Sequence, residues 1–359
     1  MTIGVLKEIS ESRVAIVPDS FKKSKLEGVE FLFEKDLGQG ALYENTAYEE
    51  YGRLASRADV LAKSDVVVSI EPPSDTELKS MQTGAFIVSM FQPFADASII
   101  ERLETIPVNA FSLDMIPRTT LAQSMDVLSS MASIAGYKAV LLAADRLPRY
   151  FPMMITAAGS IRPAKVVVLG AGVAGLQAIA TAKRLGAMVE ASDVRAAAKE
   201  EVLSLGAKFI EVEGAAEDTD AGGYAVEQSE DFLQRQRAHV QDRASQADIV
   251  ITTAQVRGRK APILLPKSTV EMMKAGSVVV DLASSTGGNC ELSKDGASIT
   301  TPNGVTVIGD SNLAASMPQH SSLLFSNNVL NFLQYIIKDG SVSTDHEDEI
   351  VKGSCISLA

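Results

Sequence analysis

The sequence predicts an α/β protein with two Rossmann-like subdomains, each built on a parallel sheet. Two observations support this fold class. Short apolar runs alternate with helical stretches in two separate regions of the 359-residue chain, and a long helical stretch lies between those regions. Strands that alternate with helices indicate parallel neighbours, because a parallel pair needs a long crossover connection. We expect a cleft between the two sheets and long helices that link them.

The first region, Met1 to about Met115, carries no glycine-rich fingerprint. Its helical stretches include Val60–Ala62 and Ile99–Leu103. Its apolar runs are predicted strands: Thr2–Leu6, Glu30–Phe33, Asp65–Ile70, Phe86–Met90 and Pro107–Phe111. The long helical stretch Leu121–Arg146 follows, and Pro148 ends it.

The second region is more clearly patterned, and its six predicted strands match a doubly wound sheet. The strands are Lys165–Leu169, Met188–Ser192, Lys208–Val212, Asp248–Thr252, Ser277–Asp281 and Gly304–Gly309. The helices between them are Val173–Leu185, Ala196–Leu205, Ser229–Ala244 and Thr269–Met273. An amphipathic helix over Leu323–Ile337 can pack back on the first subdomain. The predicted domains are therefore residues 1–130 with 315–359, and residues 131–314.

The composition disfavours several classes of protein. The 33 basic and 45 acidic residues give a net charge of −12, which argues against non-specific binding to nucleic acid or to an anionic membrane. Cys290 and Cys355 lack a paired spacing, so we expect no disulfide and no metal site. Two free thiols fit a reducing compartment. The apolar stretch Val166–Ala182 is interrupted by three glycines and Gln177. It indicates a strand, a turn and a helix rather than a membrane span, so we expect a soluble chain.

The segment Gly170-Ala171-Gly172-Val173-Ala174-Gly175 follows a predicted strand and opens a predicted helix. The first glycine permits a tight turn, the second lets the backbone approach a pyrophosphate, and the third lets helix and strand pack closely. The helix N-terminus presents free N–H groups and a positive dipole end to phosphates. The glycine pattern alone is a weak signal, so its context decides the prediction.

Asp193 supplies that context, because it ends the next predicted strand, 18 positions beyond Gly175. A carboxylate there can accept hydrogen bonds from both ribose hydroxyls and repels a 2′-phosphate, which favours NAD over NADP. Arg195 can accommodate a 2′-phosphate, but we interpret it as a contact to the adenosine side or to the phosphates. The alternative is a turn that binds nothing, with Asp193 as a helix cap. The context favours NAD(H) binding by residues 131–314.

The chain resembles the NAD(H)-binding component of proton-translocating NAD(P) transhydrogenase, in the alanine dehydrogenase/transhydrogenase superfamily. The resemblance covers nearly the whole chain in order. It rests on four segments: the glycine turn with its flanks (PAKVVVLGAGVAGLQAIATAKRLGA), RTTLAQSMDVLSSMASIAGYKAV, GGYA, and AGSVVVDLASSTGGNC.

This resemblance implies direct hydride transfer between NADH on this chain and NADP⁺ on a second peripheral component. It also implies a membrane component that conducts protons, a homodimer of this component, and a peripheral location on the cytoplasmic or matrix-like face of the membrane. Hydride transfer between two nicotinamides needs no acid or base from the protein, only apposed rings and excluded water. We therefore expect positioning residues rather than a catalytic triad.

The resemblance assigns the site residues in two groups. The residues at the nicotinamide end are Arg118, Gln123, Asp126 and Ser129, with Tyr224 on a mobile loop that closes over the nucleotide. Besides Gly170 and Gly175, the residues that contact NAD are Ala171, Gly172, Val173, Asp193, Val194, Arg195, Gly223, Gln236 and Gln255. Without the resemblance, Arg118 and Asp126 are explained equally well as a salt bridge at a helix start, and Tyr224 as an ordinary aromatic residue on a loop.

The chain departs from the family pattern at three places. Gln255 stands where an aliphatic residue is usual, and Arg257-Gly258-Arg259-Lys260 is more basic than the usual proline-containing turn. Leu121 replaces a basic residue. We expect the adenosine contacts to differ in detail and one phosphate or partner contact to be missing.

The nearest alternative is alanine dehydrogenase, which shares the two-subdomain plan and the early Lys7-Glu8 and Arg13-Val14-Ala15 signature. That enzyme uses a lysine, a histidine and an aspartate around its substrate. The matching positions here are Ile70-Glu71-Pro72, Met90-Phe91-Gln92 and Ser285, and the histidines are His239, His320 and His346, in helical or tail stretches. Reductive amination would lack its proton donor. A non-catalytic NAD-binding sensor is a further alternative, because one fold serves both functions.

Overall fold

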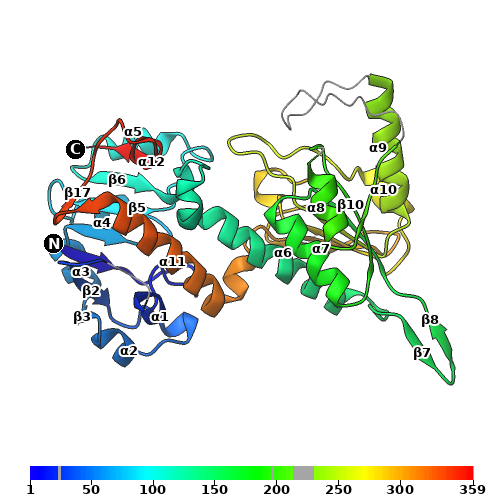
Figure 1. The fold of residues 1–359 in the computed structure, drawn as a ribbon, viewed down its shortest axis with the longest axis horizontal. Helices are drawn as coiled ribbons and strands as arrows, with labels where there is room; N and C mark the ends of the chain where they lie inside the picture. The colour runs from blue at the N-terminus through cyan, green and yellow to red at the C-terminus, as the bar shows by residue number, and fades with distance from the viewer. Residues whose placement is uncertain (23–25, 196, 213–229, 359) are drawn as a thin grey trace. The chain divides into compact units, whose positions relative to one another are not determined.

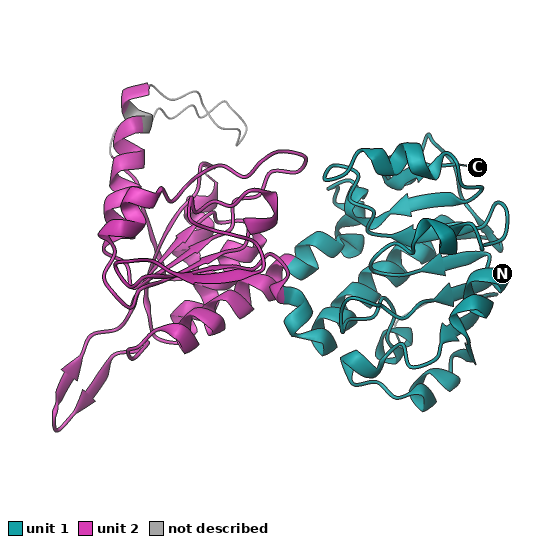
Figure 2. Ribbon diagram, turned by 180° about the vertical axis from the view of Figure 1, so that it is seen from behind, with its two compact units in different colours: residues 1–131, 314–359 teal, residues 132–313 magenta. Residues whose placement is uncertain are grey.

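The computed structural model describes residues 1–22, 26–195, 197–212 and 230–358. The chain forms two compact units, coloured separately in Figure 2. Unit 1 comprises Met1–Met131 and Ala314–Ala359, and unit 2 comprises Ala132–Leu313. Within the described residues, each unit carries one seven-stranded, largely parallel sheet. The predicted α/β class with two parallel sheets is confirmed.

The sheet of unit 1 has the order β18-β6-β5-β4-β1-β2-β3 (Figure 1). All neighbours are parallel except β18, which runs antiparallel to β6. The first six strands therefore follow the doubly wound order 3-2-1-4-5-6, with its switch point between β1 and β4. The strands are β1 Thr2–Val5, β2 Glu30–Glu34, β3 Gly52–Ala55, β4 Val66–Val68, β5 Phe86–Ser89, β6 Asn109–Ser112 and β18 Cys355–Ser357.

Helices cover both faces of this sheet, because alternate strand residues point to opposite sides. Phe33 and Val68 pack in one core with Phe332 of α11, whereas Leu32 and Val67 pack in a second core with α3, α4 and α5. The helices of unit 1 are α1 Pro18–Phe21, α2 Asn45–Glu49, α3 Arg57–Lys63, α4 Asp75–Leu78, α5 Ser98–Leu103, α11 Pro318–Ile336 and α12 Glu349–Ser354. The prediction that the helix near Leu323–Ile337 packs on the first subdomain is confirmed by α11.

The sheet of unit 2 has the order β11-β10-β9-β12-β13-β15-β14, and only β14 runs antiparallel, against β15, within the described strands. Its six parallel strands repeat the order 3-2-1-4-5-6, so the switch point lies between β9 and β12. The strands are β9 Lys165–Leu169, β10 Met188–Ser192, β11 Lys208–Phe209, β12 Ile249–Thr252, β13 Val278–Asp281, β14 Ala297–Thr300 and β15 Thr306–Gly309.

Two groups of helices cover the sheet of unit 2. The helices α6 (Val127–Arg146), α7 (Val173–Arg184) and α8 (Ala198–Ser204) contribute to one core, and α9 (Glu230–Ser245) and α10 (Lys267–Met272) contribute to the other. Gly136 lets α6 approach α7 closely, because a Cβ at that position would lie 2.1 Å from the Ala174 carbonyl oxygen. The central strands are buried on both faces, which explains their continuous apolar sequence.

Among the described residues, α6 alone is long and apolar enough to cross a membrane by length and composition. Its first residue, Val127, belongs to a core of unit 1, whereas Ala139 and Val140 belong to a core of unit 2. α6 therefore contributes some of its apolar side chains to a core of each unit.

The strands that lack an apolar run were not predicted. These are β3, β14 and β18, which carry many half-exposed or exposed residues, and the strands of two hairpins, β7 Met154–Thr156 with β8 Gly159–Ile161 and β16 Ile337–Lys338 with β17 Ser341–Val342. The predicted helix Leu121–Arg146 is also wrong in its first turn. Leu121–Met125 is a 3-10 helix, and the backbone leaves the helical region at Asp126 (φ −75°, ψ 90°) before α6 begins. The strand predicted over Lys208–Val212 is shortened to the two residues of β11.

Candidate nucleotide-binding site

The glycine turn joins β9 to α7 at the carboxyl edge of the unit 2 sheet, beside its switch point. Gly170 has a φ of +101°, and a Cβ there would lie 2.6 Å from the Thr253 hydroxyl oxygen. A Cβ on Gly175 would lie 1.9 Å from the Gly170 carbonyl oxygen. The first and third glycines are therefore required by the turn itself and by the packing of α7 against the end of β9.

Gly172 has a different environment, because a Cβ there would meet no atom within 4 Å. Its φ of −75° is accessible to any residue, so the backbone does not require glycine. Gly172 is the N-cap of the 12-residue helix α7, and no side chain caps the helix there. The turn thus combines open space with the N–H groups and positive dipole end of a helix N-terminus, which fits a phosphate group.

Asp193 directly follows β10, and its side chain is only 8% exposed. The carboxylate accepts the Ala171 N–H at 2.7 Å and the Arg195 backbone N–H at 2.8 Å. Burial opposes ionisation of Asp193, but the hydrogen bonds from Arg195 and from the Ala171 N–H outweigh it and hold the pKa below its usual value. An ionised carboxylate therefore lies against the glycine turn. The N-cap of α8 is Ala197, so Asp193 is not a cap of that helix.

Arg195 lies over the same carboxylate. Its Nε and Nη2 atoms donate to the two Asp193 oxygens at 3.0 and 3.3 Å, and Nη2 also donates to the Ala171 carbonyl oxygen at 3.1 Å. The side chain of Arg195 is 54% exposed. The structure therefore brings together Ala171, Asp193 and Arg195, which the sequence analysis placed in one site.

Hydrogen bonds join the loop after β12 to the glycine turn and to the loop after β13. The Thr253 hydroxyl donates to the Gly170 carbonyl at 3.0 Å. Asn289, which is fully buried, accepts the Ala254 N–H at 2.9 Å and donates to the carbonyls of Ala254 and Pro262 at 2.8 and 2.9 Å. The exposed Gln255 donates to the Leu282 carbonyl at 2.7 Å.

Asp281, at the end of β13, fixes the second of these loops. Its buried carboxylate accepts the Thr252 hydroxyl and the Ala283 N–H at 2.9 Å on one oxygen. The other oxygen accepts the N–H groups of Asn289 and Cys290 at 2.9 and 3.0 Å. Asp281 and Asn289 were not predicted as site residues. The available signal was a carboxylate at the end of the apolar strand VVVD, followed by Gly-Gly-Asn.

Three other predicted nucleotide contacts lie in the described residues of unit 2. Val173 is the first residue of α7, and Val194 is largely exposed beside Asp193. Gln236 on α9 accepts the Val212 N–H at 3.0 Å and donates to the Ile210 carbonyl at 2.9 Å, so it holds the chain that follows β11. Gly223 and Tyr224 lie outside the described residues.

The predicted nicotinamide-side residues belong to unit 1, around the start of α6. Asp126 accepts the Ser129 N–H at 2.9 Å and the Ser129 hydroxyl at 2.6 Å, so it caps this helix start. Arg118 and Gln123 are exposed, and in the described structure no ion pair joins Arg118 to Asp126. The salt bridge considered as the alternative is therefore not formed. Asn328 of α11 donates to the Ser124 carbonyl at 2.8 Å and anchors the segment.

The switch point of unit 1 has the same strand order but the opposite chemistry. The buried Glu8 carboxylate accepts the N–H groups of Ile70 and Glu71 at 2.7 and 3.0 Å. Glu11 lies nearby and pairs with Arg13. Burial raises the pKa of Glu8 to about 7. Because Glu8 already occupies these amides, this edge does not suit a phosphate. Within the part of the chain that the structure describes, the edge of unit 2 offers the free donors that a dinucleotide needs.

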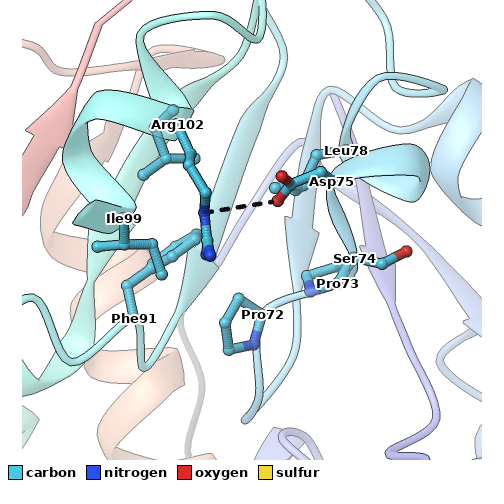
Figure 3. Close-up of a pocket in the computed structure, with 9 residues that line it drawn as sticks. Pro72, Pro73, Ser74, Asp75, Leu78, Phe91, Ile99 and Arg102 are labelled. Carbon is cyan, nitrogen blue, oxygen red and sulfur yellow. Dashed lines mark ion pairs between the residues drawn. The ribbon is translucent and has the colours of Figure 1, made fainter. Parts of the chain in front are cut away.

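Unit 1 also contains a cavity of about 240 Å³, shown in Figure 3. Its walls include Pro72, Phe91 and Arg102, and Arg102 faces Asp75 across the opening at 3.9 Å. The volume is below the usual range for small-molecule pockets, about 300–1,000 Å³. Arg102 is balanced by two acids, Asp75 and Asp96. This cavity is therefore a poor candidate for a dinucleotide.

The arrangement that alanine dehydrogenase needs is not formed by the described residues. His320 and His346 are exposed, and His239 is half-buried on α9. None of them lies at the strand ends where the alanine dehydrogenase alternative requires a catalytic histidine. Ser285, which takes the place of the aspartate, is exposed in the loop after β13.

Comparison with known proteins agrees with this geometry. Two family descriptions match: "Alanine dehydrogenase/PNT, N-terminal domain" over residues 4–135, and "Alanine dehydrogenase/PNT, C-terminal domain" over residues 139–359. An NAD(P) transhydrogenase subunit alpha polypeptide of Rhodospirillum rubrum is 42% identical over 370 residues, which cover 99% of this chain and 96% of that protein. The crystal structure of transhydrogenase from Sinorhizobium meliloti superposes with a TM-score of 0.90 at 39% identity and covers all of both chains. Alanine dehydrogenase of Bacillus subtilis is 25% identical over 357 residues, 95% of this chain and 87% of that protein.

A doubly wound sheet with a glycine turn and an acid at the end of its second strand is the nucleotide-binding form of this fold. The chain belongs to the alanine dehydrogenase/PNT family, which is a nucleotide-binding family. Within that family it is a homologue of the alpha subunit of NAD(P) transhydrogenase, to which it is far more similar than to alanine dehydrogenase.

Proposed function

We propose that the chain is the NAD(H)-binding component of a proton-translocating NAD(P) transhydrogenase, with unit 2 as the NAD(H)-binding subdomain. One observation carries this proposal: the uncapped N-terminus of α7 at Gly172 lies beside the Asp193 carboxylate. A pyrophosphate needs the first of these features and a free adenosine ribose needs the second.

The residues of unit 2 bind and orient the nucleotide. Gly172 lets the backbone approach the pyrophosphate, and the first-turn N–H groups of α7 donate to its oxygens. Asp193 accepts hydrogen bonds from the ribose hydroxyls and repels a 2′-phosphate, so NAD(H) is preferred over NADP(H). The hydrogen bonds of Asn289 hold the loop after β12 in place beside the turn. Equal dissociation constants for NADH and NADPH, measured by calorimetry, would contradict this assignment.

When bound, the nicotinamide of NADH supplies the hydride that passes to NADP⁺ on the partner component. No proton moves in that step, so the residues of this chain act by orientation and by exclusion of water. In the proposal, Gln123 holds the carboxamide, while Arg118 and Asp126 fix the ring-side ribose and amide. The hydrogen bonds from Ser129 to Asp126 keep that carboxylate in one orientation.

The proposed partners follow from the names of the relatives. Those relatives are called alpha subunits, which implies other transhydrogenase subunits. We assign an NADP(H)-binding component and a membrane component that conducts protons as the partners of this chain. The chain is then peripheral, on the cytoplasmic or matrix-like face of the membrane, and attached through these partners.

A homodimer is supported by the hairpin β7–β8, which extends from unit 2 in Figure 1. Ile155 of β7 is 73% exposed, and Met153, directly before the hairpin, is 61% exposed. An isolated two-stranded hairpin is marginally stable in water, and neighbouring exposed apolar side chains mark association surfaces. Replacing both residues with aspartate should convert the dimer to a monomer in sedimentation experiments, and a dimer that persists would contradict this interface.

The proposed activity is tested by mixing the chain with an NADP(H)-binding component and following hydride exchange between NADPH and an NAD analogue. Transfer that requires both components supports the proposal. Nucleotide binding without any transfer would favour a non-catalytic sensor. Steady oxidation of NADH by this chain alone, with pyruvate and ammonium, would favour an alanine dehydrogenase.

A further inference from the structure

The N–H groups of Arg195 and Ala171 fill every acceptor position of the Asp193 carboxylate. One oxygen accepts the backbone N–H of Arg195 at 2.8 Å and its Nε at 3.0 Å. The other accepts the Ala171 N–H at 2.7 Å and Nη2 of Arg195 at 3.3 Å. An ionised carboxylate offers about four acceptor positions. All four are filled by N–H groups of the protein itself.

The four donors differ in how easily they can leave. The backbone N–H groups of Ala171 and Arg195 make the two shortest bonds, and they belong to the glycine turn and to the bend after β10. The guanidinium donors make the two longer bonds from a side chain that is 54% exposed. Departure of the guanidinium also breaks its bond to the Ala171 carbonyl at 3.1 Å. Both backbone N–H groups stay on Asp193, and the guanidinium is already more than half exposed, so incoming hydroxyl donors can replace it on the carboxylate.

We propose that the Arg195 guanidinium is an internal occupant of the ribose-binding position, that NAD(H) displaces it, and that Arg195 thereby weakens the preference for NAD(H) over NADP(H). This inference rests on the proposed function, in which Asp193 binds the adenosine ribose. The two ribose hydroxyls need acceptor positions that only departure of the guanidinium frees. The displaced cation stays two residues from Asp193 and can pair with a phosphate on the ribose 2′-oxygen.

The alanine variant Arg195→Ala separates the two kinds of donor, because it keeps the backbone N–H and removes the guanidinium. Fluorescence titrations should show that the Kd for NADH falls about twofold to fivefold, the range set by a partly exposed ion pair. The Kd for NADPH should stay constant or rise, so the selectivity for NADH increases. Arg195→Lys keeps the charge with a single donor atom and should lie between wild type and Arg195→Ala.

Arg184→Ala is the matched control, because Arg184 is an exposed arginine at the opposite end of α7 and its replacement changes the net charge equally. It should bind both nucleotides as the wild type does. Unchanged or weaker NADH binding by Arg195→Ala, or an equal loss of NADH and NADPH, would overturn the inference. Failure of the wild-type chain to bind NADH would instead refute the proposed function, and the inference with it.

Discussion

Replacing Gly172 with alanine should abolish tight nucleotide binding without harming the fold. A Cβ at this position would meet no protein atom within 4 Å, and the backbone φ of −75° suits any residue. The free energy of unfolding should change by less than about 1 kcal/mol, the usual difference between glycine and alanine at an N-cap. The methyl group would, however, occupy the space through which a pyrophosphate reaches the amides.

The loss of affinity follows from the hydrogen bonds that the methyl group would prevent. A hydrogen bond to a charged group contributes about 1.5–3 kcal/mol, so losing one raises the Kd for NADH roughly 10- to 100-fold. Fluorescence titration measures the affinity, and thermal unfolding measures the stability. Gly175→Ala is the contrasting variant: its Cβ would lie 1.9 Å from the Gly170 carbonyl oxygen, so it should lose stability by about 3 kcal/mol. Wild-type affinity in folded Gly172→Ala would refute this account of the turn.

Two further variants test the buried polar groups of each unit. Burial raises the pKa of Glu8 from 4.5 to about 7, so the folded chain keeps a proton that the unfolded chain releases between these values. Stability should therefore fall as the pH rises through that window, by about 3 kcal/mol, and Glu8→Gln should remove the fall in urea unfolding. An unchanged pH profile in that variant would contradict the assignment. Asn289→Ala leaves the Ala254 N–H and two carbonyls without partners. It should lower the free energy of unfolding by about 2 kcal/mol and weaken NADH binding. Wild-type stability together with wild-type affinity would show that the loop does not need the Asn289 side chain.

The sequence was most informative where the physical requirement is local. Buried parallel strands such as Lys165–Leu169 must be apolar on both faces, so their sequences stand out. The glycine turn is equally easy to recognise in the sequence, because Gly170 and Gly175 are required by the backbone and by close packing. Edge strands such as Gly52–Ala55 face solvent on one side, and their composition carries no comparable signal.

The site was less predictable where it depends on contacts distant in sequence. Asn289 holds the loop that starts at Thr253, and Asp281 in turn holds Asn289. The sequence marks the two residues only as an acid after an apolar strand and an asparagine after two glycines, and it does not show which loop they contact. The hydrogen bonds by which the Arg195 guanidinium occupies acceptor positions of Asp193 also depend on side-chain geometry, which a residue pattern does not specify. Likewise, the break at Asp126 depends on its carboxylate capping Ser129, which competes with continuation of the helix.

The two sheets share one strand order, yet their carboxyl edges have opposite chemistry. At the edge of unit 1 the buried Glu8 already caps the free amides, whereas at the edge of unit 2 the start of α7 has no side-chain cap. The fold therefore provides two similar switch points, and individual side chains decide which of them can hold an anion.

The most direct test of the central claim is the affinity of Asp193→Ala for NADH, measured by the fluorescence of the reduced cofactor. The control is Asp242→Ala, which removes an exposed carboxylate of the same unit on α9. If Asp193 binds the adenosine ribose, its replacement should raise the Kd at least about tenfold, while the control leaves the Kd unchanged. An Asp193→Ala protein that binds NADH as tightly as the wild type would contradict the account.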